Sequence, residues 1–221
     1  MNISDFIEAS KDKHGPEALN GAMVFVAMDR PLDNVIRQAL SLSSFHPGKP
    51  SPWSHCFLLA ETYHGSQTAI LDCTIRDDRN SIIWNSDLIE DLGVLTKGLE
   101  GREGGIYSGI VGDYDNEKVT NCGLCFLPFL NDVQRSGIVT AGRQLQSQGY
   151  KYDLPGLLRE LVRLLVGLAW KPGIQKLLFC SAFLATTYRQ ALGSSWNVAP
   201  NIASVDVTPD ELWYSEVGVR D

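Results

Sequence analysis

One cysteine of the chain has a setting that favours its reactive, ionised form. Cys180 follows the apolar residues 177–179 and precedes small and apolar residues that suit a buried helix ending near Gly193. The unpaired N–H groups and the positive dipole at the start of such a helix stabilise a thiolate, which is the nucleophilic form of cysteine. The same thiol also suits a core position, because free cysteine is among the most buried residue types. Partners elsewhere in the chain must therefore decide between the two roles.

A histidine and an aspartate on neighbouring predicted strands are candidates for those partners. His55 opens the apolar run at residues 55–60, and Asp72 interrupts a second apolar run at 69–73. A carboxylate inside a strand is costly to bury unless a hydrogen bond or an opposite charge compensates it. If the two strands pair in register, Asp72 accepts a hydrogen bond from one ring nitrogen of His55 and leaves the other nitrogen to face a thiol. Nucleophile, base and orienting carboxylate are the groups that acyl transfer to a thiol requires.

These residues also have simpler interpretations. A histidine in a buried strand is more often a hydrogen-bonded core residue than a base, and Asp72 could be solvated at the edge of a sheet. The other histidines lie in less informative surroundings, since His14 and His46 are expected at the surface and His64 in a turn. Composition alone does not separate a catalytic group from a structural one.

The remaining motifs do not favour metal, phosphate or serine-hydrolase chemistry. Cys122 and Cys125 form a C-x-x-C pair, but the sequence has no second such pair to complete four zinc ligands. A predicted strand runs through this pair, unlike the strand-to-helix setting of a thioredoxin motif, so we assign it a structural role. The glycine-rich residues 101–105 match no phosphate-binding loop, and no G-x-S-x-G motif is present. The sequence predicts neither a metal nor a cofactor.

Composition excludes several classes of partner. The chain has 221 residues and a formal net charge of −7, which argues against binding nucleic acid. Its five cysteines lack the density of a disulfide scaffold and indicate reduced thiols and synthesis in the cytoplasm. The first residues show no basic start followed by an apolar run, so we expect no signal peptide. Residues 154–170 are apolar but carry three charged side chains, so we expect no stable membrane span.

The elements that must position the candidate residues predict one α+β domain over residues 1–221. Helices are expected in a short segment near the N-terminus, at 31–43, 84–92, 131–148 and 154–169, from Cys180 onward, and at 208–212. Strands are expected at 21–28, 53–60, 68–75, 106–111 and 122–129. The apolar face of residues 154–169 is expected to pack in the core, since its polar face is too weakly basic for a membrane surface.

The order of these features resembles a known family. A strand at 21–27 and a helix at 31–43 precede Ser54-His55, and Asp72 lies on the next strand. Then come the segment 149–153, with sequence Gly-Tyr-Lys-Tyr-Asp, a long helix, and Phe179-Cys180-Ser181 at the start of a helix. This order resembles the circularly permuted NlpC-type papain-like cysteine hydrolases, in which the histidine strand precedes the cysteine helix. The resemblance covers about residues 21–213, and Ala22 departs from it, because the family has aspartate after the strand glycine.

The resemblance implies a papain-like α+β fold, in which an antiparallel sheet packs against helices and the nucleophile begins a helix. It implies that Cys180 is the nucleophile, His55 the base and Asp72 the third member, a position that varies within such families. Residues next to the matched motifs, namely Trp53, Ser54, Tyr152 and Ser181, are expected to contact substrate. By analogy with the family, the expected reaction is cleavage of an amide bond in a peptidoglycan peptide.

Two other functions stay open at this level. The related lecithin:retinol acyltransferase-like branch contains acyltransferases, thioesterases and lipid hydrolases, but it usually has a second histidine where this chain has Asp72. A catalytically inactive papain-like domain used for binding is the other alternative. If the substrate is peptidoglycan, it lies in the cell envelope, whereas the cysteines indicate synthesis in the cytoplasm. This mismatch suggests a bacterial toxin. Such a toxin would be delivered to a competitor's periplasm by a secretion apparatus and neutralised by a cognate immunity protein.

Overall fold

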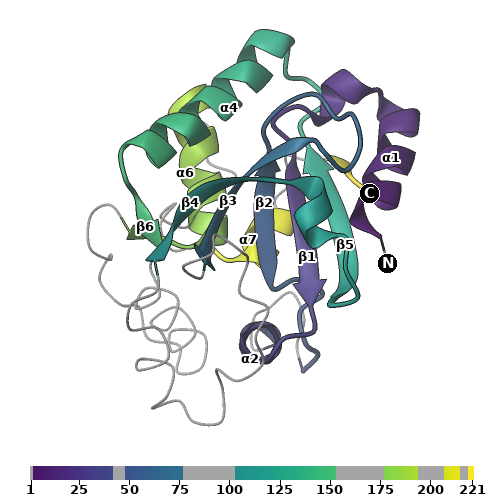
Figure 1. The fold of residues 1–221 in the computed structure, drawn as a ribbon, viewed down its shortest axis with the longest axis vertical. Coiled ribbons are helices and arrows are strands. Elements are labelled where there is room, and N and C mark those ends of the chain that lie inside the picture. Colours follow the sequence, from purple (N-terminus) through teal and green to yellow (C-terminus); the bar gives the residue numbers. More distant parts are fainter. Residues whose placement is uncertain (1, 42–47, 77–102, 153–176, 194–206, 215–218) are drawn as a thin grey trace.

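A computed structural model describes residues 2–41, 48–76, 103–152, 177–193, 207–214 and 219–221 of the chain (Figure 1). Within these residues the fold is of the α+β class, as the sequence predicts. The helices expected at 84–92 and 154–169 lie outside the described residues, and so does His46.

The described strands form one sheet of eight, in the order β7-β6-β4-β3-β2-β1-β5-β8. Neighbouring strands are antiparallel except β6 and β7, which are parallel. The long strands match the five expected ones: β1 (Met23–Met28), β2 (His55–Leu59), β3 (Ala69–Arg76), β4 (Glu103–Ile110) and β5 (Val119–Phe126). Three two-residue strands complete the sheet: β6 (Lys151–Tyr152), β7 (Leu177–Leu178) and β8 (Val219–Arg220).

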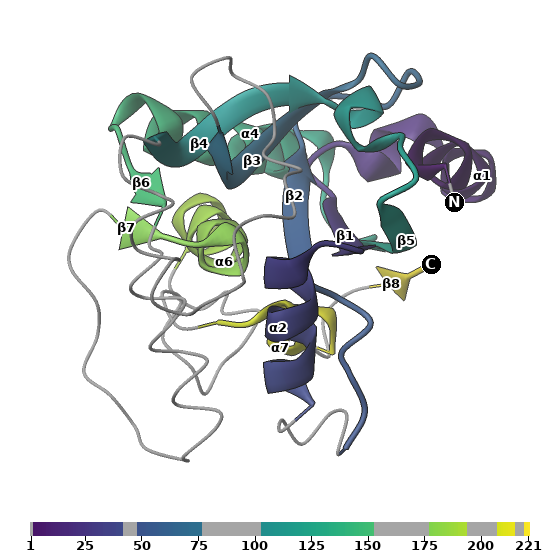
Figure 2. The ribbon, with the colours of Figure 1, turned by 60° about the horizontal axis from the view of Figure 1, so that its bottom comes forward.

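Helices cover both faces of the sheet. The described α-helices are α1 (Ile3–His14), α2 (Pro31–Leu40), α4 (Asp132–Ser147), α6 (Cys180–Leu192) and α7 (Pro209–Trp213). Two short 3-10 helices, η1 (Pro16–Leu19) and η3 (Val111–Tyr114), precede β1 and follow β4. Figure 2 shows α6 beneath β3 and β4, with β7 leading into it. Both chain ends lie beside α1 and β5 (Figures 1 and 2).

Alternation along the strands divides the core into two apolar layers. In β1, Phe25 packs into the layer that contains α4 and α6, whereas Val24 and Val26 pack into the layer that contains α1, η1 and η3. All six residues of β1 are buried, as expected for a strand covered on both faces. Strand β2 is divided in the same way, with Cys56 on the α6 side and Phe57 on the η3 side.

Local signals set several helix ends where the sequence places them. Helix α4 begins with a capping box in which Asn131 accepts from the Gln134 N–H at 2.9 Å. Helix α7 begins with another, formed by Thr208 and Glu211, which confirms the expected capped turn. Gly15 follows α1 with a φ of 86°, a conformation that disfavours other residues.

One glycine allows an aromatic cluster to pack directly on the sheet. The rings of Trp53 and Trp213 lie 4.5 Å apart, and Phe25 lies 5.2 Å from Trp213. Gly123 of β5 pairs with Phe25 and lies under both indoles. A Cβ atom at this position would lie 2.6 Å from Trp53 and 2.7 Å from Trp213.

We therefore expect Gly123→Ala to lower the free energy of unfolding by about 1–3 kcal/mol, because the added methyl overpacks the cluster. Urea unfolding followed by tryptophan fluorescence measures the change. Gly137→Ala is the matched control: its Cβ meets nothing within 4 Å on helix α4, and alanine there should stabilise by about 0.5–1 kcal/mol. If both substitutions changed the free energy of unfolding by the same amount, the aromatic cluster would accommodate the extra methyl group without overpacking, and the prediction would be wrong.

Candidate active site

A fully buried carboxylate lies at the centre of the site. Asp72 of β3 is 0% exposed, and each of its oxygens contacts a different partner. Oδ1 lies 2.8 Å from His55 Nε2, and Oδ2 accepts from the Tyr114 hydroxyl at 2.7 Å. The alternative of a strand-edge aspartate solvated by water is therefore wrong. Burial of this carboxylate is compensated by two donors instead.

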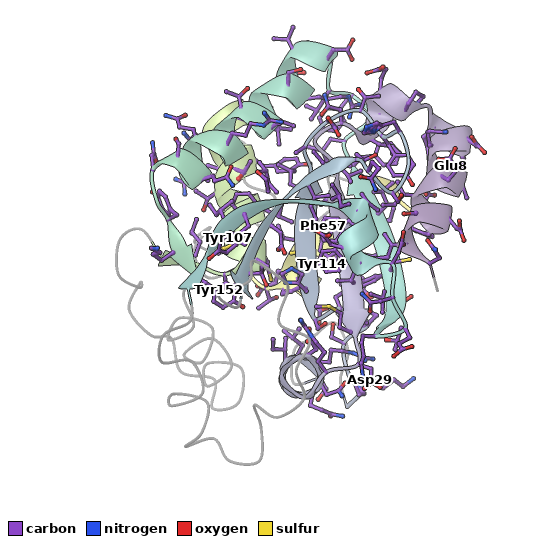
Figure 3. All side chains as sticks on the ribbon, in the orientation of Figure 1. Glu8, Asp29, Phe57, Tyr107, Tyr114 and Tyr152 are labelled. Carbon is purple, nitrogen blue, oxygen red and sulfur yellow. The ribbon has the colours of Figure 1, made fainter. Side chains whose placement is uncertain are left out.

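Tyr114 reaches Asp72 from η3, on the sheet face opposite α6. Its ring stacks on Phe57 with centroids 4.6 Å apart and on His55 with centroids 6.1 Å apart. Figure 3 shows Tyr114 beside Phe57 above β2. This aromatic stack leaves the phenol little freedom to turn away from the carboxylate.

His55 is held in one orientation by the same carboxylate. Its Nε2 must carry a hydrogen in order to donate to Asp72, so Nδ1 is the nitrogen left for another partner. That partner is Cys180, because the charge and hydrogen bonding of Cys180 raise the pKa of His55 and the charge of His55 lowers the pKa of Cys180. The structure thus brings together the three residues that the sequence nominates, although they come from β2, β3 and α6.

Cys180 is the first residue of α6, where backbone donors are unpaired. Its preceding residue, Phe179, has an extended backbone and a side chain that cannot accept a capping hydrogen bond. The first-turn N–H groups and the helix dipole therefore act on the sulfur without competition from a side-chain cap. Cys180 is 5% exposed, which keeps most water away from the sulfur.

The sulfur lies where strands β2 and β3 part. The two strands are paired at Leu59↔Ile70 and Leu58↔Leu71. The pairing ends there, although β2 begins at His55 and β3 extends to Arg76. Beyond Leu58, Cys56 is not paired with β3, and hydrogen bonding from its thiol and its backbone lowers the pKa of Cys180. The end of the strand pairing therefore leaves a backbone donor for the sulfur.

The pKa shifts of Cys180 and His55 both favour an ion pair between these two side chains. Hydrogen bonding from the Cys56 thiol, together with the charge of His55, outweighs burial and holds the pKa of Cys180 well below its usual range. Burial lowers the pKa of His55, but the charges of Asp72 and Cys180 outweigh it and raise that pKa to about 10. Burial also raises the pKa of Cys56, which therefore stays a thiol and a donor. Both directions favour a Cys180 thiolate beside a His55 imidazolium at neutral pH.

The residues expected to contact substrate differ in their exposure. Trp53 is 4% exposed within the aromatic cluster, Ser181 is 0% exposed, and Ser54 is 2% exposed and accepts from the Met28 N–H at 3.2 Å. Tyr152 is half-buried, and its Cα is paired with that of Leu178. Burial and the nearby charge of Cys180 raise the pKa of Tyr152, so it is a protonated phenol near the sulfur.

Sequence reasoning missed two residues that contact the proposed triad. Tyr114 belongs to a polar segment that predicts only a turn, and Cys56 belongs to an apolar run that predicts only a strand. The residue type and position of Tyr114 do not indicate an interaction with Asp72, and those of Cys56 do not indicate an interaction with Cys180. The adjacency of Cys56 to His55 is the one sequence signal available.

Cys122, Cys125 and His14 lie on elements other than those that carry the candidate residues. Cys122 and Cys125 are buried free thiols within β5, which confirms that a strand runs through the pair. His14 is not an exposed surface residue, since its side chain is 20% exposed and its Nε2 lies 2.7 Å from Asp221. Across the described segments, no three His, Cys, Asp or Glu side chains are grouped to hold a metal ion. None of the described helices is long and apolar enough to cross a membrane.

No model of a protein family matches the chain, and no curated protein matches its sequence significantly.

Replacing Asp72 by asparagine should weaken the ion pair while keeping the shape of the side chain. Without the carboxylate charge the pKa of His55 falls from about 10, so the imidazolium is lost at a lower pH and the pKa of Cys180 rises. The rate of Cys180 alkylation by iodoacetamide at about pH 6 should drop by about tenfold for each unit by which the pKa of Cys180 then exceeds that pH. Mass spectrometry of the Cys180 peptide over a pH series measures the rate. An unchanged rate would contradict the assigned role of Asp72.

Two tyrosine variants calibrate this result. Tyr114→Phe removes one of the two donors to Asp72 and should give a smaller decrease than Asp72→Asn. Tyr63→Phe is the matched control, since this buried hydroxyl also donates at 2.7 Å but to the backbone oxygen of Ser4. If Tyr63→Phe slowed alkylation as much as Tyr114→Phe, the loss would reflect general destabilisation.

Proposed function

We propose that the protein is a cysteine hydrolase with Cys180 as nucleophile, His55 as general base and acid, and Asp72 as the residue that orients His55. The observation that carries this proposal is the buried contact chain from Tyr114 through Asp72 and His55 to Cys180. An inactive binding domain would have no need for a buried imidazolium and a buried thiolate, which are costly to desolvate. Paired ions of this kind at a helix N-terminus are typical of an activated thiol.

The reaction follows from the position of each group. The Cys180 thiolate attacks the amide carbonyl, and its own backbone N–H, unpaired at the start of α6, donates to the developing oxyanion. His55 gives its Nδ1 proton to the leaving amine as the C–N bond breaks and a thioester forms. His55 then takes a proton from water, which attacks the thioester and releases the acid and the thiolate. Asp72 holds Nε2 throughout, so Nδ1 faces the reacting atoms.

The substrate class and the finer fold rest on the family resemblance. A papain-like fold in permuted order accounts for a histidine strand that precedes the cysteine helix, and it implies a peptidoglycan peptide as substrate. The lecithin:retinol acyltransferase-like alternative is weaker, because the residue that contacts His55 is a carboxylate and not a second histidine.

Digestion of purified sacculi tests the proposal directly. The wild-type protein should release new peptide fragments, identified by mass spectrometry of the muropeptides, and Cys180→Ala should lose at least about 10³-fold of this activity. Cys125→Ala is the control, since Cys125 is also buried and free but lies on β5. Full activity of Cys180→Ala would refute the mechanism, and hydrolysis of lipid esters without any muropeptide cleavage would favour the alternative.

We further propose that such an enzyme acts as a toxin in the periplasm of a target bacterium, because peptidoglycan is reached there. Expression in bacteria with an added export signal should cause lysis, whereas expression in the cytoplasm should leave growth unchanged. Growth curves and phase microscopy measure both outcomes, and the exported Cys180→Ala protein should be harmless. Toxicity confined to cytoplasmic expression would argue for a different target.

A further inference from the structure

Three of the five cysteines meet at the start of α6. Cys56 of β2 and Cys73 of β3 are both 0% exposed and belong to the same apolar layer as Cys180. The Cys73 thiol donates to the backbone oxygen of Leu178 at 3.2 Å, so it is directed at the chain that leads into α6. The Cys56 thiol instead acts on Cys180, because hydrogen bonding from it lowers the pKa of that sulfur. Hydrolysis needs only one of these three thiols.

The Cys56 and Cys180 sulfurs differ in charge and in access. Cys180 keeps a small exposed fraction of 5% and is the thiolate, whereas Cys56 has none and is the thiol. An oxidant therefore meets Cys180 first, and oxidants react with thiolates rather than thiols. Cys56, whose thiol acts on Cys180 from the same buried layer, is positioned to react with an oxidised Cys180.

We propose that Cys56 and Cys180 form a redox modification site, in which a hydroperoxide oxidises Cys180 and Cys56 then closes a disulfide with it. The S–S bond length of about 2.05 Å is the separation to which the Cys56 and Cys180 sulfurs would have to close. Cys56 is not paired with β3, although it stays paired with Phe25 of β1.

The chemistry balances in two steps. The Cys180 thiolate attacks the terminal oxygen of the hydroperoxide, the O–O bond breaks, and the sulfur takes the hydroxyl group as a sulfenic acid. The leaving oxygen takes a proton from the His55 imidazolium and departs as an alcohol or water. The Cys56 sulfur then attacks the sulfenic sulfur, the S–O bond breaks, and the thiol proton leaves with the hydroxyl group as water. Loss of the negative charge on Cys180 also removes one cause of the raised pKa of Cys56, so oxidation itself makes Cys56 more acidic.

The disulfide would occupy the sulfur that the proposed hydrolysis uses, and thiols would restore it. Without Cys56, the sulfenic acid has no adjacent thiol to trap it and proceeds to the irreversible sulfinic acid. The site would therefore protect Cys180 from irreversible loss. Its chemistry requires a thiolate but no substrate, so it can be tested whether or not the protein is a hydrolase.

The test is intact-mass analysis of the reduced protein after brief exposure to hydrogen peroxide. The wild-type chain should lose two hydrogen atoms in mass, recover them with dithiothreitol, and yield one linked peptide pair containing Cys56 and Cys180. Cys56→Ser should instead gain oxygen, first as a dimedone-reactive sulfenic acid and then as a form that dithiothreitol does not reduce. Cys73→Ser is the matched control and should behave as the wild type, because it changes an equally buried thiol on the adjacent strand.

Three results would overturn the proposal. These are linkage of Cys180 to Cys73, equal resistance of Cys56→Ser and wild type to irreversible oxidation, and oxidation of Cys122 or Cys125 before Cys180. Peptide mapping of the wild type alone decides the first and third, so the proposal stays falsifiable if Cys56→Ser fails to fold. Loss of sacculus digestion with an intact disulfide pattern would refute the hydrolase and leave this site standing.

Discussion

Burial of the Asp72 carboxylate is the constraint on which this structure most depends. A carboxylate with no exposed surface, in the middle of a strand, is tolerated only if donors from other elements reach both of its oxygens. His55 and Tyr114 supply them from β2 and η3, which fixes the β2–β3 pair and the η3 turn relative to each other. The orientation of the imidazole is thus set by the folding of the sheet. Because the imidazole is already held in place, His55 loses no further conformational entropy when it acts on a bound group.

A second constraint is that the thiol and the imidazole come from opposite faces of the sheet. His55 stacks on Tyr114, on the face covered by α1 and η3, whereas Cys180 and Cys56 belong to the layer of α4 and α6. Continuous pairing between β2 and β3 would separate the two groups. The pairing ends at Leu58↔Leu71, and the sulfur meets the imidazole beyond that point. A break in the ladder is what allows a residue on one face to act on a residue of the other.

These two constraints explain what the sequence could and could not predict. His55 and Asp72 were predictable as a pair, because an aspartate in an apolar strand needs a donor and a histidine lies on the adjacent strand. Tyr114 was not, since it lies 42 residues from Asp72 in a polar turn and acts through a tertiary contact. The five long strands follow from apolar runs, but β6, β7 and β8 have two residues each and carry no periodicity. The break between β2 and β3 is equally invisible, because the residue pattern predicts both strands straight through it.

The Cys56 thiol beside Cys180 favours the reactive thiolate form of Cys180 and is also a partner with which an oxidised Cys180 could react. A neutral donor stabilises the thiolate without adding a buried charge, whereas a second cation beside His55 would repel the imidazolium and weaken the ion pair. A serine at position 56 would also be a neutral donor, and its hydroxyl could not form a bond to an oxidised sulfur. The difference between cysteine and serine at this position is therefore redox chemistry rather than electrostatics. That difference is why the pair of thiols, and not the thiolate alone, points to a role beyond hydrolysis.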